Sequence, residues 1–413
     1  MSGGSISRRG FIRSALLYGA GILSAGPLAW VSSRASGRRG EGRPPVPRRV
    51  LADLHVHPMI NAWNRSTALG VEYPLLAKLV EKTANPTSLT WETCHQAGID
   101  VLCAAHFNVF DEWLSMPTDP NPEAPVNTLR MMDMLEQELE GKAAPYARLA
   151  RNWKDLDRMV NSIPKQSPDY RVAVVHALEG GHSLGGDLRA LDTFAKRGVA
   201  IIGLTHFFNK GVASAANPYP YFPDANSAPA HQGLSPFGKQ IIERMEELGI
   251  IVDITHCTST AVADVLEAAQ KPLIATHSSV RTLGDHPYSL SDEHIQEIAR
   301  RGGIIGIILY PYVLSNYGNA HLAERHGSLN DVVRTIRYVR KICGTHKCIG
   351  IGSDFSGFIT GPKEISRLDE IDQLRRMLLE EFDNDVRVVE DMMAQNVIDF
   401  LLRNWKSGMQ SGE

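Results

Sequence analysis

The 413-residue sequence has little of several features that would mark a specialised class of protein. Its five cysteines are too few for a disulfide-stabilised scaffold, and the odd number leaves at least one thiol unpaired. Basic residues are not in excess, because 43 Lys and Arg face 46 Asp and Glu, so we expect no nucleic-acid partner. With 43% hydrophobic and 22% charged residues, the composition is that of a globular chain rather than a disordered one.

The N-terminus has the pattern of an export signal. Arg8 and Arg9 precede Phe11, and a weakly apolar run from Ser14 to Trp30 follows. We predict a twin-arginine signal peptide at residues 1–35, a periplasmic or extracellular location, and contact with the membrane only in transit. The alternative is an uncleaved anchor, for which the apolar run is shorter than the ~20 residues of a stable span. Residues 36–49 read as a Gly/Pro/Arg tether, and 50–413 as a single domain.

After the tether, short apolar runs alternate with amphipathic stretches. Eight runs show little alternation of polarity, as expected for strands that are buried on both faces of a parallel sheet. They are Val50–His55, Ile99–Ala105, Arg171–Leu178, Val199–Thr205, Ile250–Thr255, Pro272–Thr276, Gly303–Leu309 and Cys348–Ser353. The intervening helical patterns are Leu188–Arg197, Pro236–Leu248, Ser259–Gln270, Asp292–Arg301 and Leu329–Cys343.

This alternation predicts an α/β protein with a (β/α)8 TIM barrel. Residues 107–170 form an insertion after the second strand, with an amphipathic helix near Val126–Glu140, and Glu364 to Trp405 forms C-terminal closing helices. The alternative is an open doubly wound sheet, but no G-x-G-x-x-G turn follows an early strand.

Polar residues follow the predicted strands where a barrel places an active site. Because the C-terminal ends of parallel barrel strands open onto one face, we expect these side chains to meet. His55 and His57 are two residues apart on one strand and project the same way, a good half-site for zinc. An isolated H-x-H is usually incidental, but an acid and three histidines at other strand ends favour a metal site. The set is His55, His57, Glu179, His206, His256, His277 and Asp354.

Five potential ligands exceed the three that one catalytic zinc needs, so we expect two divalent ions, with zinc the expected metal. Glu179 is the predicted bridge, and two ions roughly 3.5–4 Å apart can hold a hydroxide between them. Asp354 would then transfer protons and His206 would donate to the developing oxyanion. The alternatives are that His206 is a buried histidine with satisfied hydrogen bonds and that Asp354 caps a helix.

Other polar residues receive lesser roles. His106 and His176 are expected to pack or to support the ligands, and Asp53 and His182 are candidates for orienting ligands through hydrogen bonds. Cys343 and Cys348 lie close enough in sequence to pair in an oxidising compartment.

Several strings of the sequence form a recognisable set: Leu178-Glu179-Gly180-Gly181-His182, Leu204-Thr205-His206, Gly233-Leu234-Ser235-Pro236-Phe237-Gly238, Asp253-Ile254-Thr255-His256, His277-Ser278-Ser279 and Gly352-Ser353-Asp354-Phe355. Taken together, over about residues 50 to 400, they resemble the membrane (renal) dipeptidase family. The resemblance implies a two-zinc (β/α)8 hydrolase that cleaves dipeptides, tolerates a D-residue at the C-terminal position and is often a homodimer. It also implies that Glu179 bridges, that His256 and His277 hold one ion and the first-strand pair the other, and that His206 and Asp354 act on the substrate.

Two departures from the family pattern concern charge. The first-strand motif is usually His-x-Asp, whereas His55-Val56-His57 makes this site one charge more positive. The family also has an arginine about eleven residues after the strand-six histidine, where this chain reads Asp285-His286-Pro287-Tyr288. Arg281 is the candidate replacement for binding the substrate carboxylate, the alternative being a solvated loop charge. Tyr310 matches a family tyrosine that lines the substrate site.

These observations predict an exported hydrolase that uses a metal-bridged hydroxide on dipeptide-type amide bonds. One alternative is an amidohydrolase that acts on another amide, an N-acyl amino acid, a lactone or an ester. The other is a non-catalytic metal- or ligand-binding barrel, against which Asp354 argues because a binding protein needs no proton-transfer acid.

Overall fold

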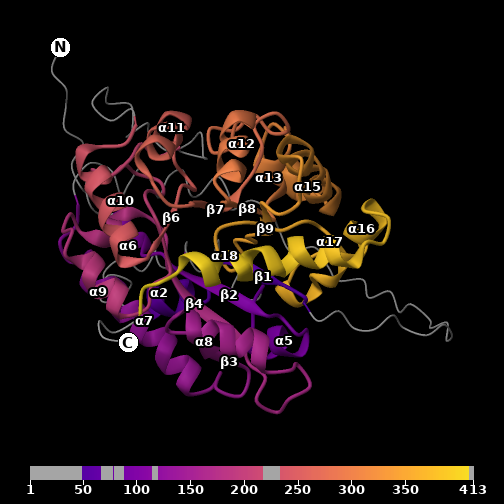
Figure 1. Cartoon of the computed structure of the whole chain (residues 1–413), viewed down its shortest axis with the longest axis horizontal. Helices are drawn as coiled ribbons and strands as arrows, with labels where there is room; N and C mark the ends of the chain where they lie inside the picture. The colour runs from indigo at the N-terminus through magenta and orange to yellow at the C-terminus, as the bar shows by residue number, and fades with distance from the viewer. Residues whose placement is uncertain (1–48, 67–77, 79–87, 114–119, 217–232, 409–413) are drawn as a thin grey trace.

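The computed structural model describes residues 49–66, 78, 88–113, 120–216 and 233–408. Eight parallel strands pair side by side and close into a barrel, so the predicted fold class is confirmed (Figure 1). Each predicted strand is present, and the order around the barrel is β1 (Ala52–Val56), β2 (Val101–His106), β4 (Val172–Leu178), β5 (Ile201–Gly203), β6 (Ile251–Asp253), β7 (Ile274–Ser278), β8 (Ile304–Ile307) and β9 (Ile349–Ile351). The predicted signal, residues 1–35, and residues 36–48 of the tether lie outside the described residues.

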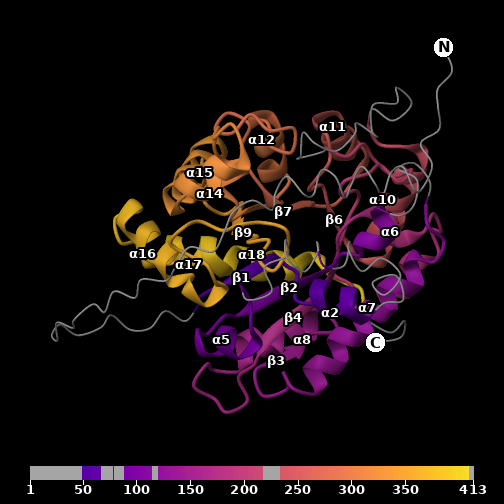
Figure 2. The ribbon, with the colours of Figure 1, turned by 180° about the vertical axis from the view of Figure 1, so that it is seen from behind.

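The five helices expected between the strands also form, with the caps that their sequences favour. Ser235, Thr258 and Ser291 each accept a backbone N–H of the first turn, and Ser328 forms a capping box with Asp331. The helices surround the strands in Figures 1 and 2. They are α9 (Ala190–Lys196), α10 (Pro236–Leu248), α11 (Ser259–Ala268), α12 (Asp292–Arg300) and α15 (Leu329–Cys343).

Shorter elements occupy the connecting segments. The sequence patterns did not single these out, because each is only a turn or two long and carries too few residues for a helical period to show. They are α2 (Ile60–Ser66), α5 (Trp91–Gln96), η3 (Gly181–Leu184), α13 (Pro311–Leu314), α14 (Ala320–His326) and η5 (Leu368–Glu370). Among the described helices, none is both long and apolar enough to cross a bilayer.

The insertion after β2 contains the expected amphipathic helix, α7 (Ala124–Glu140), and a strand that the sequence did not reveal. This strand, β3 (Ala147–Leu149), pairs in parallel with the first residues of β4 and extends the sheet outside the barrel ring. Only Ala147 of its three residues is buried, so it has no apolar run to mark it. The insertion also holds α6 (Val109–Trp113), α8 (Trp153–Asp157) and the π-helical turn η2 (Arg158–Ser162).

The C-terminal helices close the barrel as expected. After α16 (Asp372–Glu381), the chain forms α17 (Val386–Glu390), a π-helical turn η6 (Asp391–Gln395) and α18 (Asn396–Asn404) without a break. Val397, Phe400 and Trp405 are buried in one cluster with the inward-facing side chains of the strands. Figure 1 shows α18, in yellow, crossing the strands.

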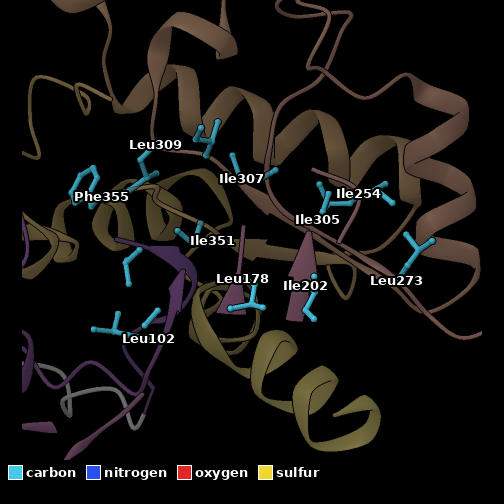
Figure 3. Packing of buried hydrophobic residues seen from close by; sticks show 14 of the residues in the cluster. Leu102, Leu178, Ile202, Ile254, Leu273, Ile305, Ile307, Leu309, Ile351 and Phe355 are labelled. Atoms are coloured by element: carbon cyan, nitrogen blue, oxygen red, sulfur yellow. The ribbon is translucent and has the colours of Figure 1, made fainter. Parts of the chain in front are cut away.

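Two apolar layers fix the direction in which the strand side chains point. On β4, Ala173, Val175 and Ala177 belong to the inner cluster, whereas Val174 and Leu178 pack in the cluster between strands and helices. Figure 3 shows this outer packing around Leu178 and its neighbours. Because side chains alternate along a strand, Glu179 continues the inward-facing set of Ala177 and comes to lie above the barrel centre.

Candidate metal centre

The first-strand histidines converge with Glu179 at the C-terminal ends of the strands. The Nε2 atoms of His55 and His57 are 3.1 Å apart, so the two side chains do project the same way. His55 Nε2 lies 3.2 Å from Glu179 Oε1, and His57 Nε2 lies 3.5 Å from Glu179 Oε2. All three side chains are buried. These three side chains form the first set of potential metal ligands.

A second set meets the same carboxylate from β6 and β7. The Nε2 atoms of His256 and His277 are 3.0 Å apart, and they lie 3.2 Å and 3.4 Å from Glu179 Oε1. Glu179 is therefore common to both sets, in the position expected of a bridging carboxylate.

The spacing of these atoms fits divalent metal ions. Tetrahedral zinc with Zn–N and Zn–O bonds of about 2.0–2.2 Å places neighbouring ligand atoms roughly 3.3–3.6 Å apart. The contacts within each set, from 3.0 Å to 3.5 Å, are close to that separation. Four imidazoles and one carboxylate are also ligand types that suit zinc. The described residues contain three overlapping groups able to hold an ion: His55, His57 and Asp354; His55, Glu179 and His277; and Glu179, His206 and His256.

Buried charge makes the cluster receptive to cations. Burial raises the pKa of Glu179, but the surrounding histidines, His206, His55 and His57 foremost, hold it well below its usual range. Burial would lower the pKa of His55, yet the nearby Glu179 carboxylate raises it to about 9. An ionised carboxylate enclosed by imidazoles thus needs positive charge beside it, which protons or metal ions can supply.

A hydroxyl on β7 sets the orientation of two imidazoles. Thr276 Oγ1 donates to Asp253 Oδ2 at 2.6 Å, so it can accept from His277 Nδ1 at 3.0 Å and from His55 Nδ1 at 3.3 Å. With a proton on Nδ1, each ring presents the lone pair of Nε2 to the cluster, which is the form that binds a metal. No pattern in the sequence had marked Asp253 and Thr276 as orienting residues.

Unusual backbone conformations occur at this face of the barrel. His256 and Asp354 have φ values of 67° and 61°, in the left-handed region that side chains larger than glycine seldom adopt. Gly180 has φ 94°, and a Cβ there would lie 2.4 Å from His182 Nδ1. The glycine after Glu179 therefore permits a turn that no larger residue would fit.

His206 is held by Glu112, an acid that no pattern in the sequence identifies. Glu112 Oε2 lies 2.8 Å from His206 Nδ1, and Glu112 Oε1 accepts the backbone N–H groups of Phe207 and Phe208. The opposite edge of the ring points into the cluster, and His206 Nε2 lies 3.8 Å from Glu179 Oε1. Glu112 belongs to α6 in the insertion, and its only signal in the sequence is a position a few residues past the end of β2.

Asp354 reaches the cluster from the loop after β9. Its Oδ1 lies 3.1 Å from His57 Nε2, and its backbone N–H donates to the carbonyl of His55. The carboxylate lines a pocket together with His57, Glu179 and His256 of the two ligand sets. Asp354 is followed by turn residues and no helix begins there, so the structure does not place it as a helix cap.

The two predicted substrate-binding residues are placed differently. Tyr310 is buried and lines the pocket, beside Ile308. Arg281 does not line it, because its Nη2 donates to the carbonyl of Ser289 on the same loop. Tyr288, eleven residues after His277, lines the pocket instead, with its ring centroid 4.9 Å from that of His256. A role for Arg281 in binding the substrate carboxylate stays a prediction.

The remaining polar candidates lie around the cluster. His106 and His176 bond each other at 2.9 Å, and His176 also contacts Glu136 on α7, so both support the packing as expected. Asp53 accepts the backbone N–H groups of His55 and Ser353, which ties the ends of β1 and β9 together. The His182 ring packs edge-on against Phe107 at 5.7 Å and makes no contact with the ligand sets that the structure records. All five cysteines are free.

Comparisons with known proteins agree with the fold and the site. A family model described as membrane dipeptidase (peptidase family M19) matches residues 48–407. A dipeptidase of Aspergillus oryzae, aclJ, is 31% identical over 51% of this chain and 46% of its own, and tcpJ of Claviceps purpurea is 26% identical over 66% and 58%. The chain therefore spans about half the length of these curated relatives.

Solved structures share the architecture. Dipeptidase AC superposes with a TM-score of 0.69 at 20% identity, over 88% of this chain and 100% of its own. The dipeptidase PvdM of Pseudomonas aeruginosa superposes with a TM-score of 0.64 at 23% identity, over 78% and 89%. At these identities the likeness shows the fold.

The closed parallel barrel and its buried cluster of histidines around one glutamate define the class of protein, a (β/α)8 barrel with a candidate metal centre at the C-terminal ends of its strands. Within that class, the match over residues 48–407 shows that the chain belongs to the membrane dipeptidase family, peptidase family M19.

Proposed function

We propose that this protein is a metal-dependent dipeptidase that hydrolyses the amide bond of dipeptide-type substrates. The observation that carries the proposal is the sharing of one buried carboxylate, Glu179, by two pairs of histidines. The match to the membrane dipeptidase family also supports the proposal. A neighbour of 19% identity, a metallopeptidase of Rhodobacter sphaeroides, was crystallised with a phosphinate mimic of the dipeptide L-Ala-D-Ala, which makes a D-residue at the C-terminal position worth testing here.

The ligand sets suggest two ions, with zinc as the expected metal. His55 and His57 would hold one ion, His256 and His277 the other, and Glu179 both. When bound, the ions would supply Lewis acidity to the scissile carbonyl and would lower the pKa of water.

The chain's own groups would then move protons and stabilise charge. Asp354, at the edge of the pocket, would take a proton from the attacking water and give it to the leaving amine. His206, whose ring faces the pocket from the β5 end, would donate a hydrogen bond to the oxygen on which charge develops. The barrel interior below this cluster is filled with apolar side chains.

A hydrolysis screen tests the proposal. Purified protein with added zinc would be given L,L- and L,D-dipeptides, N-acyl amino acids and a lactone, with the Asp354→Asn variant as the matched control. Turnover of dipeptides that the variant lacks supports the proposal. Turnover of the lactone or of another amide alone would favour the broader amidohydrolase alternative, and no turnover by metal-loaded protein would favour a binding barrel.

We also propose that the protein is exported by the twin-arginine route and acts outside the cytoplasm. The support is the Arg8-Arg9 pair before Phe11 and the short apolar run that follows. The N-terminal sequence of protein secreted by cells tests this, because cleavage near residue 35 is expected and the Arg8→Lys, Arg9→Lys variant should stay inside. The homodimer that the family resemblance implies stays a prediction.

A further inference from the structure

Two cysteines outside the metal centre flank a short turn that the proposed function does not use. Cys343 is the last residue of α15, and Cys348 comes directly before β9. Gly344 ends the helix with a φ of 66°, in the left-handed region, and so begins the reversal of the chain. The turn of residues 344–347 therefore connects the two cysteines and leads into the strand that precedes Asp354.

The two thiols are in contact across this turn. The S–H group of Cys348 donates to the sulfur of Cys343, and Cys348 Sγ also lies 3.9 Å from the carbonyl oxygen of Thr345. Cys348 is buried in the apolar cluster between strands and helices, and the half-buried Cys343 packs against that cluster. Sulfur atoms that already contact each other can form a disulfide with little movement of the backbone.

Bonds to the C-terminal helices hold the turn in place. His346 Nε2 lies 2.9 Å from Asp391 Oδ2, and Lys347 forms an ion pair with the same carboxylate. The side-chain amide of Asn396 donates to the carbonyl of His346. Because these bonds fix the backbone between the two cysteines, the fold itself holds the two sulfurs together.

The two thiols differ in reactivity. The hydrogen bond from Cys348 lowers the pKa of Cys343, whereas the same bond and burial raise the pKa of Cys348. Cys343 is also the more exposed of the two, since only 3% of Cys348 is accessible. A thiol that is both more acidic and more accessible reacts first with an oxidant, and here that thiol is Cys343.

The other three cysteines have none of these properties. Cys94 lies on α5, Cys103 on β2 and Cys257 in the turn after β6, and all three are buried. Burial raises the pKa of each of these thiols. Buried thiols of high pKa are inert toward oxidation, so these three serve as internal controls.

We propose that Cys343 and Cys348 are a redox-active pair that forms a disulfide in an oxidising environment and thereby stabilises the turn between α15 and β9. Cys343 is the attacking thiol and Cys348 the resolving thiol. The inference is independent of the dipeptidase proposal, and export would bring the protein into a compartment where such bonds persist.

The co-reactant is a small-molecule disulfide such as oxidised glutathione. The Cys343 thiolate attacks one of its sulfurs, the S–S bond breaks, and one glutathione leaves as a thiolate. Cys348 then loses its proton and attacks the Cys343 sulfur of the mixed disulfide, which releases the second glutathione. Two protein thiols are oxidised, one glutathione disulfide is reduced, and the two protons pass to the departing thiolates.

Peptide mapping of the full-length protein tests the bond directly. Trypsin cleaves after Lys341 and Lys347, so the two cysteines fall in separate peptides, 342–347 and 348–363. Wild-type protein that is equilibrated with oxidised glutathione, alkylated after unfolding and digested without reductant should yield these two peptides linked, with the other three cysteines alkylated. Recovery of the two peptides unlinked overturns the proposal.

Single variants test the order of the two steps. Folded Cys348→Ser should accumulate a mixed disulfide between Cys343 and glutathione, whereas folded Cys343→Ser should leave Cys348 unmodified over the same time. Equal modification of both variants would refute the assigned order. If either variant does not fold, the map of the wild-type protein still decides whether the bond forms.

Thermal unfolding measures what the bond does. The oxidised wild-type protein should melt roughly 2–5 °C above the reduced protein, because the cross-link restricts the unfolded chain. The double variant with Cys343→Ser and Cys348→Ser is the matched control, and its melting temperature should not respond to the oxidant. A linked wild-type protein that melts at the same temperature as the reduced one would remove the stabilising role.

Discussion

The carboxylate of Glu112 lies 2.8 Å from Nδ1 of His206, on the side of the ring that faces away from the metal ligands. The other oxygen of Glu112 accepts two backbone N–H groups, so the carboxylate is an acceptor on both sides and is ionised. His206 Nδ1 must therefore carry the proton. His206 can donate from Nε2 only if a second proton is bound there, and the adjacent carboxylates favour this charged form. Burial lowers the pKa of His206, but Glu179 and Glu112 raise it above its ordinary value.

The first prediction follows from this pair. Glu112→Gln keeps an oxygen for the backbone N–H groups but removes the charge that holds His206 protonated. We expect kcat to fall about 10–100-fold with metal content and KM nearly unchanged. Steady-state kinetics and metal analysis of the same preparation measure this.

Asp111→Asn provides the matched control for Glu112→Gln. It makes the same change of charge at the neighbouring residue, whose carboxylate accepts from Asn108, Asn121 and Asn127 rather than from His206. Its kcat should stay within about threefold of the wild-type value, since ΔΔG‡ would be well under 1 kcal/mol. An equal loss in both variants would mean that Glu112 acts only through the packing of the insertion.

The second prediction separates holding the metal from moving protons. Glu179→Ala removes the ligand that both histidine pairs share, so the purified variant should contain little metal. Asp354→Asn should retain metal and lose turnover about 10²–10⁴-fold, the usual contribution of a general acid–base group. Metal analysis after gel filtration and a dipeptide assay measure both. A folded Asp354→Asn variant with full activity would remove Asp354 from the mechanism.

The strand-end residues could be predicted because a parallel barrel brings the C-terminal ends of all its strands to one face. The eight apolar runs give the strands, and the residue after each run must lie on the same face. His55, His57, Glu179, His256 and His277 all came from that rule and do converge. No contact had to be known in advance.

Glu112 could not be predicted in this way. It contacts His206 across 94 residues of sequence, and it lies on a five-residue helix whose pattern carries no information about its partner. Arg281 illustrates a different limit of the sequence. Its nearness to His277 in sequence suggested a role in the pocket, but the turn of the loop directs its guanidinium to Ser289. The direction of a loop side chain depends on local hydrogen bonds, and the periodic patterns of strands and helices do not reveal these bonds.

The third prediction concerns removal of the metal. Ions that bind the folded protein and not the unfolded chain stabilise it, by about 2.7 kcal/mol when the free ion is at 100 times its Kd. Thorough chelation should therefore lower the melting temperature of the wild-type protein by several degrees, and added zinc should restore it. Thermal unfolding followed by circular dichroism measures the shift. In Glu179→Ala the chelator should change little, and an equal shift in that variant would point to an ion elsewhere.

The fourth prediction tests whether the N-terminal end of the barrel contributes to folding stability but not to catalysis. Trp405 is fully buried and donates from Nε1 to Ser407 Oγ, which in turn donates to the carbonyl of Val199, just before β5 begins. It thus packs at the N-terminal end of the strands, opposite the metal ligands. Trp405→Ala should cost about 3–5 kcal/mol of unfolding free energy by leaving a cavity, measured by denaturant unfolding.

The exposed Val386 is the control for Trp405, since it is 45% accessible and its change to alanine should alter stability by about 0.5 kcal/mol or less. At a temperature where Trp405→Ala remains folded, its kcat/KM should equal that of the wild type, because the metal ligands lie at the opposite, C-terminal ends of the strands. A variant that is folded, metal-loaded and yet inactive would show that the two ends of this barrel are mechanically coupled. Retained activity would instead place α18 and Trp405 in stability alone.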